Sequence, residues 1–250
     1  MGRDNLLVLE NITKRFGGIV AVDNVSLTIR RRELVGIIGP NGAGKTTLFN
    51  IINGVYKPDT GRIIFDGIDI TDMPPYKRVE LGLARTFQIP RPWGALTVRE
   101  NVAVGALFGS ERSLNVLEAL EEVDRILEIV GLYEKRNEIS SKLTVPEKKL
   151  LELARALAMK PKLLLLDEVV AGMSPADADR IVDTIKRVRD ELDVAVVALV
   201  EHVMRAVARF AERVIAMHQG RVLLEGPPQE VLRDKRLVEI YLGEIPPWLK

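Results

Sequence analysis

The chain has 250 residues, of which 47% are hydrophobic, so a large buried core is expected and disorder is not. Its 36 basic and 35 acidic residues give a formal net charge of +1, which does not favour nucleic acid or an anionic membrane as a partner. Cysteine is absent, which excludes disulfides and thiolate metal sites and fits a reducing cytosol. No signal peptide is expected, and the longest uncharged apolar run, Val194–Val200, is far shorter than the ~18 residues that span a bilayer.

Short strands begin the chain. Residues 5–38 predict strands, because Val25–Ile29 alternates apolar and polar residues and Leu34–Ile38 is a continuous apolar run typical of a buried strand. A glycine-rich turn and a helix follow, and a turn at Lys57–Gly61 precedes a further strand at Arg62–Gly67.

The middle of the chain predicts helices. One begins near Leu96, where Thr97 and Glu100 have the spacing of a capping box. Apolar residues then recur at helical spacing from Val116 to Val130, up to Gly131. A further helix ends at Lys160-Pro161, after which strands return at residues 162–166 and 194–200, and a hairpin is expected at residues 214–226. The pattern predicts an α/β core with a helical insertion at roughly residues 90–160 rather than two chain-separated domains.

Residues 39–46, GPNGAGKT, match the phosphate-loop pattern G-x-x-x-x-G-K-[ST]. The loop follows a buried strand and opens a helix, which makes a chance glycine-rich turn improbable. Backbone N–H groups of such a loop cradle phosphates, Lys45 reaches the β and γ oxygens, and the Thr46 hydroxyl binds Mg²⁺. The expected nucleotide-binding residues here are Gly39, Pro40, Asn41, Gly42, Ala43, Gly44, Lys45, Thr46 and Thr47.

A second motif, LLLLDE, ends in two acids. Its four leucines predict a central strand, and Asp167 lies at the carboxyl end, where ligands bind in open α/β sheets. We expect Asp167 to hold Mg²⁺ directly or through water, and Glu168 to polarise an attacking water as general base. A strand ending in solvated acids is the alternative, which the phosphate loop disfavours.

These motifs resemble those of the ATP-binding-cassette ATPases, the nucleotide-binding subunits of ABC transporters, and the resemblance covers about residues 5–244. It implies a P-loop NTPase (RecA-like) α/β core, an N-terminal antiparallel β-subdomain and an inserted α-helical subdomain. It also implies a single domain over residues 1–250, with residues 1–88 and 161–250 as the catalytic core and about 89–160 as the helical subdomain.

The resemblance assigns further site residues. Phe16 corresponds to the aromatic that stacks on adenine, although a Phe beside a strand is equally expected in a core. Gln88 corresponds to the glutamine that contacts Mg²⁺ or the attacking water, and His202 to the histidine that contacts the γ-phosphate. His218, in the predicted hairpin, receives no role.

Two helix starts are expected to face a second subunit. Ser174, Pro175 and Asp177 form a favourable N-terminus by themselves, and the resemblance adds that Asp177 lies across a dimer interface. The family motif LSGGQ is replaced by LTVPE at residues 143–147, and Val169 replaces the usual proline or alanine after the catalytic acid. The expected contacts to the opposite subunit are Thr144, Val145, Pro146, Glu147 and Asp177.

The LTVPE segment also has the spacing of a capping box, in which Thr144 and Glu147 bond each other's backbone N–H groups. Val145 limits close approach and Pro146 has no N–H to donate. We therefore expect a contact to the γ-phosphate of the opposite subunit that is weakened but not abolished.

The loop after Gln88 contains Arg91 and Trp93, and both residue types are favoured interface anchors. We expect them to contact a membrane subunit, the alternative being a tryptophan buried over the helical core.

The segments RTFQ, VEHVM and LVEIYLGE resemble the first ATPase subunit of branched-chain amino-acid importers. The resemblance implies ATP and Mg²⁺ as cofactors, hydrolysis coupled to transport, and a place on the cytoplasmic membrane face. Its implied partners are a second ATPase subunit, two transmembrane permease subunits and, indirectly, a solute-binding protein. The alternatives are a soluble ABC ATPase acting on nucleic acid or ribosomes, a weakly hydrolysing regulatory subunit, and a small-molecule kinase.

Overall fold

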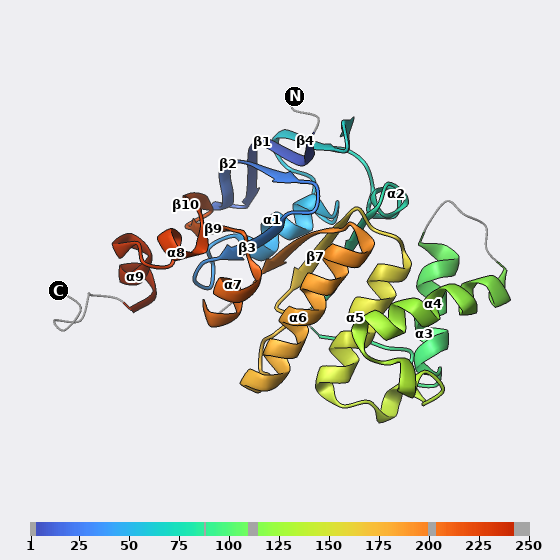
Figure 1. The fold of residues 1–250 in the computed structure, drawn as a ribbon. Helices are drawn as coiled ribbons and strands as arrows, with labels where there is room; N and C mark the ends of the chain where they lie inside the picture. Colours follow the sequence, from blue (N-terminus) through green and yellow to red (C-terminus); the bar gives the residue numbers. More distant parts are fainter. Residues whose placement is uncertain (1–3, 88, 110–114, 200–203, 243–250) are drawn as a thin grey trace.

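The computed structural model describes residues 4–87, 89–109, 115–199 and 204–242 (Figure 1). The N-terminal strands form a four-stranded antiparallel sheet in the order β2-β1-β4-β5. Its strands are β1 (Asn5–Phe16), β2 (Ile19–Arg30), β4 (Thr60–Phe65) and β5 (Ile68–Asp69). β1 and β2 are longer than the short strands predicted, because register shifts between them let the pairing continue past irregular positions.

A second sheet has six strands in the order β10-β9-β3-β8-β7-β6. These are β3 (Leu34–Ile38), β6 (Leu83–Arg85), β7 (Leu163–Asp167), β8 (Ala195–Leu199), β9 (Arg213–His218) and β10 (Arg221–Gly226). Pairing is parallel from β9 to β6, and β10 joins β9 as the antiparallel arm of a hairpin. The predicted buried strands and hairpin are confirmed, and the carboxyl ends of the parallel strands lie at one edge.

The helices of the predicted insertion are α3 (Val98–Phe108), α4 (Val116–Val130) and α5 (Val145–Ala158), with short 3₁₀ turns at Tyr133–Lys135 and Ser140–Lys142. Capping boxes start all three helices, and Gly131 ends α4 in the left-handed conformation at φ 76°. The other helices are α1 (Lys45–Ile52), α2 (Pro75–Glu80), α6 (Pro175–Leu192), α7 (Met204–Phe210), α8 (Pro228–Val231) and α9 (Lys235–Leu242).

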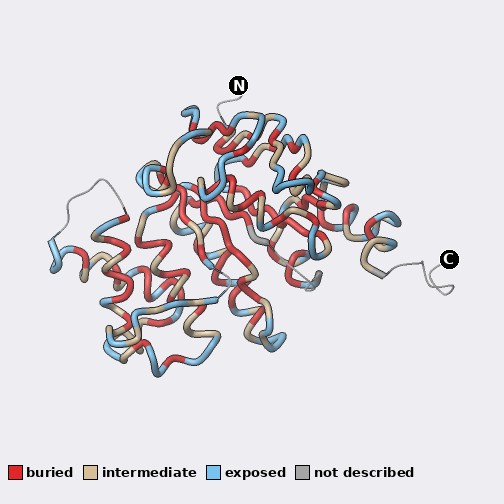
Figure 2. Tube along the Cα trace, turned by 180° about the vertical axis from the view of Figure 1, so that it is seen from behind, coloured by how far each residue is buried: buried red, intermediate tan, exposed pale blue. Residues whose placement is uncertain are grey.

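Each face of the six-stranded sheet belongs to a different hydrophobic cluster. Figure 2 shows buried residues concentrated in the middle of the molecule. Successive strand residues point to opposite faces, so Leu163 and Leu165 pack with α1 and the antiparallel sheet, while Leu164 and Leu166 pack with the helices. The sheet is therefore buried on both sides, as its continuous apolar strands predict. In the parts of the chain that are described, no helix combines the length and apolar composition needed to cross a bilayer.

A buried arginine ties α1 to α2. Arg78 is only 1% exposed and donates hydrogen bonds to four backbone carbonyl oxygens, those of Ile51, Ile52, Thr71 and Met73. Burial lowers the pKa of Arg78 to about 10, so the side chain stays a cation at neutral pH. The guanidinium thereby satisfies carbonyls at the carboxyl end of α1, where a cation also complements the helix dipole.

Replacing Arg78 by Met is expected to destabilise the protein, because four carbonyl oxygens, two of them in buried contacts, lose their shared donor. A loss of ~2–4 kcal/mol corresponds to a melting temperature lower by roughly 5–15 °C for a chain of this size. Thermal unfolding followed by circular dichroism measures it, with Glu80→Ala as the control at an exposed position of the same helix. An unchanged melting temperature for Arg78→Met would contradict this account.

Candidate active site

The glycine-rich loop joins the carboxyl end of β3 to α1. Gly44 is the N-cap of α1 with φ 96°, and an added Cβ would lie 2.3 Å from the carbonyl oxygen of Ala21. Gly39 is equally constrained, since its Cβ would lie 2.3 Å from the carbonyl oxygen of Met217. Glycine is therefore required at both positions. No side chain caps α1, so the helix presents its first N–H groups as an anion-binding end.

Lys45 and Thr46 begin α1 side by side but differ in exposure. Lys45 is buried, and its Nζ donates to the carbonyl oxygens of Gly39 at 2.7 Å and Pro40 at 2.9 Å. Thr46 is exposed, as are Asn41 and Gly42 in the loop. The ammonium is thus held inside the curve of the loop, while the Thr46 hydroxyl is accessible.

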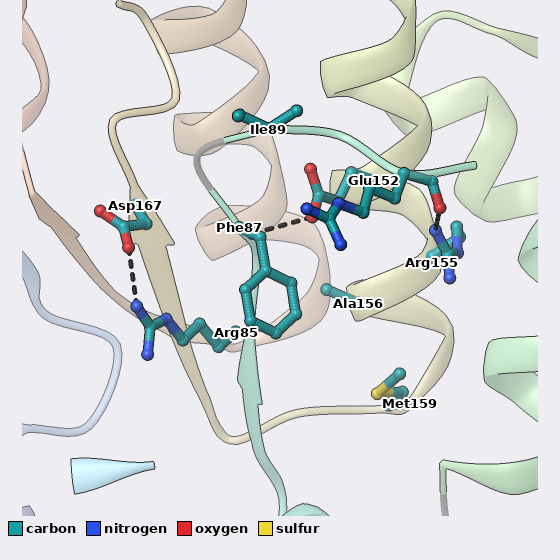
Figure 3. Close-up of a pocket in the computed structure, with 9 residues that line it drawn as sticks. Arg85, Phe87, Ile89, Glu152, Arg155, Ala156, Met159 and Asp167 are labelled. Carbon is teal, nitrogen blue, oxygen red and sulfur yellow. Dashed lines mark hydrogen bonds and ion pairs between the residues drawn. The ribbon is translucent and has the colours of Figure 1, made fainter. Parts of the chain in front are cut away.

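Asp167 ends β7 as a buried carboxylate. Its Oδ2 accepts a hydrogen bond from Arg85 Nη2 at 2.7 Å, and its backbone N–H donates to the Thr86 hydroxyl at 3.3 Å. Figure 3 shows this Arg85–Asp167 contact. Arg85, at the end of β6, also donates from Nη1 to Asn50 Oδ1 on α1 at 2.6 Å. One guanidinium therefore bridges the strand that ends in Asp167 and the helix that begins at the phosphate loop.

Glu168 follows Asp167 at a sharp turn. Its φ of 47° lies in the left-handed region, which is uncommon for a residue with a side chain. Its carbonyl oxygen accepts from Lys149 Nζ of α5 at 2.7 Å and from the N–H of Ala171 at 3.1 Å. Burial lowers the pKa of Lys149, although nearby carboxylates oppose the shift. The turn after β7 is therefore held by a side chain from the helical insertion.

The oxygen donors at this edge fit Mg²⁺. A buried carboxylate and an accessible hydroxyl, those of Asp167 and Thr46, are hard ligands of the kind that Mg²⁺ prefers. Within the described ranges, no group of three or more His, Cys, Asp or Glu side chains is placed to hold a metal. Mg²⁺ commonly uses one or two protein oxygens and completes its shell with water and phosphate oxygens.

Gln88 and His202, predicted to contact Mg²⁺, water or the γ-phosphate, lie outside the described residues.

Phe16 is described and does not belong to a core, because it is 43% exposed at the end of β1. Its ring meets Tyr56 edge to face at 5.1 Å, and Lys14 Nζ lies 5.6 Å from the ring centroid. Because Ala21 of the following strand touches Gly44, this hairpin lies against the phosphate loop.

The predicted capping boxes and helix starts are present in the LTVPE and MSPAD segments. Glu147 Oε2 accepts from the N–H of Thr144 at 2.8 Å and from its hydroxyl at 2.9 Å, and Lys135 Nζ lies 2.6 Å from Glu147 Oε1. Burial opposes ionisation of Glu147, yet these hydrogen bonds lower its pKa. At the second segment the Asp177 N–H donates to Ser174 Oγ at 3.2 Å.

The first turn of α5 therefore has few donors to offer a ligand. The Glu147 N–H already lies 3.5 Å from Thr144 Oγ1, and Pro146 has no N–H. The Val145 amide remains, beside a side chain that is 64% exposed. The Thr144 hydroxyl hydrogen is directed at Glu147, so a phosphate would have to compete with that carboxylate for it.

A groove of about 550 Å³ lies between the segment after β6 and α5 (Figure 3). Arg91 lines this groove, and Trp93 lies next to it through its contact with the lining residue Arg155. The Trp93 backbone is fixed by Asn101 and Ser140, whereas its side chain is 44% exposed and lies under the Arg155 guanidinium at 4.0 Å. Arg155 Nη1 also donates to the Arg91 carbonyl at 3.1 Å. The tryptophan is thus half-exposed at the rim rather than buried in the helical core.

The structure adds functional candidates that the sequence analysis missed. Arg85 and Lys149 contact the turn of Asp167 and Glu168, and Glu152 accepts from the Phe87 N–H in the groove at 2.8 Å. Burial raises the pKa of Glu152 and lowers that of Arg155. An arginine at the end of an apolar strand, three residues before Gln88, was the available signal for Arg85.

Comparison with known proteins agrees with this geometry. The model of the family described as ABC transporter matches residues 22–171. The chain is 36% identical to the high-affinity branched-chain amino acid transport ATP-binding protein LivG of Salmonella typhimurium, over 96% of this chain and 98% of that protein. It is 35% identical to the probable branched-chain amino acid transport ATP-binding protein LivG of Methanocaldococcus jannaschii, over 97% and 100% of the two chains.

Solved structures give the same result. An ATP-binding cassette of an ABC transporter in its ADP conformation superposes with a TM-score of 0.87 at 33% identity, covering 96% of this chain and 99% of that one. A dimeric cassette in a post-hydrolysis state, bound to ADP and Pi, superposes with a TM-score of 0.79 at 27% identity over 89% of this chain and 99% of that one. The predicted family and fold class are confirmed, and the chain belongs to the ABC transporter family as one of its ATPase cassettes.

Proposed function

We propose that this chain is the ATP-hydrolysing motor subunit of a membrane importer for branched-chain amino acids or a similar small polar solute. The observation that carries the proposal is the meeting of the phosphate loop with Asp167 and Glu168 at one edge of the parallel sheet. The solute class rests on the similarity to LivG proteins, whose names state branched-chain amino acid transport.

The reaction is phosphoryl transfer to water, which needs mainly positioning and charge stabilisation. The loop amides and Lys45 bind the β- and γ-phosphates, and Phe16 stacks on adenine. Thr46 and Asp167 would hold Mg²⁺, which when bound supplies charge neutralisation at the phosphates. Glu168 orients the water and takes its proton, and Gln88 and His202 complete the surroundings of the γ-phosphate.

Two cassettes would pair head to tail, so that Thr144–Glu147 and Asp177 of one face the phosphate loop of the other. We call the expectation that this contact to the γ-phosphate is weakened the weakened-contact hypothesis. It is supported by the first turn of α5, because the Thr144 hydroxyl already donates to Glu147 and Pro146 has no N–H to donate. The Glu147 carboxylate is paired with Lys135, which limits its repulsion of a phosphate. A sister subunit with the usual motif would give a dimer one strong site.

The groove beside Arg91 and Trp93 is the proposed seat of a short helix from a permease subunit. Exposed Phe87, Ile89 and Trp93 supply apolar contacts, and the Arg155 guanidinium and Glu152 carboxylate supply polar ones. Docking there would place the cassette on the cytoplasmic membrane face, with two permease subunits and, beyond them, a solute-binding protein. The balanced charge of the chain does not support the rival nucleic-acid role.

Replacing Glu168 by Gln is expected to retain ATP binding and to reduce hydrolysis at least 100-fold, because an amide cannot accept the proton of water. Equilibrium binding of ATP and phosphate release by the assembled complex measure the two effects. Glu191→Gln, at an exposed position of α6, is the control and should hydrolyse ATP normally. Turnover like that of the wild type would remove Glu168 from the role of base.

Converting residues 144–147 to Ser-Gly-Gly-Gln is expected to raise the ATPase rate of the complex by roughly 10-fold or more. One or two restored charge-assisted hydrogen bonds of ~1.5–3 kcal/mol each account for the gain. Thr144→Ser alone keeps Val145, Pro146 and Glu147 and should stay near the wild-type rate. If neither the rate nor the affinity of the ATP-bound dimer increases, the weakened-contact hypothesis is wrong.

Trp93→Ala is expected to weaken assembly with the permease subunits by about 10-fold or more, since aromatic anchors dominate interface energies. Co-purification and ATP-driven solute uptake in vesicles measure the effect. Phe108→Ala is the matched control, because this aromatic is 81% exposed at the end of α3, whereas Trp93 is held next to the groove by Arg155. Intact assembly and uptake with a folded Trp93→Ala protein would exclude Trp93 as an anchor.

A further inference from the structure

Arg85 is a buried cation that the proposed reaction does not use. Its side chain is 6% exposed, and that of its partner Asp167 is 7% exposed. The guanidinium lies near two aromatic rings, with its central carbon 5.8 Å from the centroid of Phe49 and 5.6 Å from that of Phe87. Its two terminal nitrogens are committed to Asn50 and Asp167, at 2.6 and 2.7 Å.

This arrangement bears directly on the proposed metal carboxylate. Arg85 occupies Oδ2 of Asp167, so it fixes the orientation of the carboxylate and leaves Oδ1 as the oxygen free of this bond. The guanidinium also neutralises the carboxylate in a buried setting, where screening by solvent is weak. Mg²⁺ at Asp167 would therefore bind a carboxylate whose negative charge is already balanced by Arg85.

The same guanidinium reaches the partner-facing groove. Arg85, Phe87 and Asp167 all line this cavity, which continues to Glu152 on α5 (Figure 3). Phe87 is 59% exposed, and its ring lies on the guanidinium while its N–H is bonded to Glu152. A protein segment seated in the groove would press on the Phe87 ring and through it on Arg85.

The chemistry of arginine suits the position of Arg85 between Asp167, Asn50 and two aromatic rings. Its planar fork serves acceptors on two elements while its face stacks on aromatic rings, which a lysine cannot do. Its Nε–H is buried and has no hydrogen-bond partner among the described residues. A buried donor left unsatisfied costs free energy, so the arrangement with Asp167 and Asn50 leaves one hydrogen bond of the guanidinium unmade.

We propose that Arg85 is a positioning residue through which occupancy of the groove sets the affinity of the Asp167 carboxylate for Mg²⁺. With the groove empty, Arg85 competes with the metal at Asp167. A permease segment in the groove shifts Phe87 and draws the guanidinium away, which exposes the carboxylate charge to Mg²⁺. The inference rests on the proposed function, because it takes Asp167 as a Mg²⁺ ligand and the groove as the permease contact.

The test measures binding rather than turnover. Mg²⁺ is titrated against the full chain with a fluorescent non-hydrolysable ATP analogue, and the half-saturating Mg²⁺ concentration is recorded. Arg85→Met removes the competing cation, so this concentration should fall about tenfold, a difference of ~1.4 kcal/mol. Arg85→Lys keeps a cation but loses the fork that holds Asn50 and Asp167 together, so its value should lie between those of the wild type and Arg85→Met. Arg62→Met, which removes an exposed arginine paired with Asp69, is the control.

The assembled complex supplies the second arm. Assembly with the permease subunits should lower the half-saturating Mg²⁺ concentration of the wild type and leave that of Arg85→Met unchanged. If Arg85→Met does not fold, Asn50→Asp replaces it, since a carboxylate at this position draws the guanidinium from Asp167 and should also lower the value.

An unchanged or raised half-saturating Mg²⁺ concentration in Arg85→Met overturns the inference. The same result in Asn50→Asp overturns it where that variant replaces Arg85→Met. It is also overturned if assembly changes the half-saturating Mg²⁺ concentration equally in the wild type and in Arg85→Met. A purely structural role would lower the melting temperature of Arg85→Met without moving its Mg²⁺ titration. These failures leave the proposed function standing, whereas a wild-type chain that binds no nucleotide at all would contradict the proposed function itself.

Discussion

The candidate site depends on the parallel pairing of β3, β8 and β7. Because these strands run in one direction, the phosphate loop after β3 and the acids after β7 emerge at the same edge of the sheet. Apolar clusters cover both faces, so the strands cannot shift register without moving leucines out of the core. The rigidity of the sheet thereby fixes the chemical groups, and the loops only complete their orientation.

Buried polar contacts then join the sheet to its surroundings. Arg78 fastens the far end of α1, Arg85 connects α1 to the end of β7, and Lys149 connects α5 to the turn of Glu168. Each contact crosses from one element to another, and two of them meet the Asp167–Glu168 turn. A movement of the helical insertion would therefore reach the candidate site through α5 and Lys149, and a ligand in the groove would reach it through Phe87 and Arg85.

Local chemistry made much of this fold predictable from the sequence. The buried strands, the capping boxes at Thr97 and Thr144 and the end of α4 at Gly131 are set by short-range patterns, and the structure confirms them. Short helices such as α2 and α8 have too few residues for a periodic pattern. The order of strands in the sheet and the neighbours of Arg85 depend on tertiary packing, which no local pattern encodes. For the same reason the exposure of Phe16 and the stacking of Trp93 under Arg155 required the structure.

The central claim is that the phosphate loop and Asp167–Glu168 form an ATP·Mg²⁺ site closed by a second cassette. A structure of the Glu168→Gln complex with ATP and Mg²⁺ tests it most directly. The account predicts phosphates on residues 39–46, Mg²⁺ between Thr46 and Asp167, and the α5 start of the opposite subunit facing the γ-phosphate. Nucleotide bound elsewhere, or a closed dimer in which Thr144 lies far from the phosphate, would contradict it.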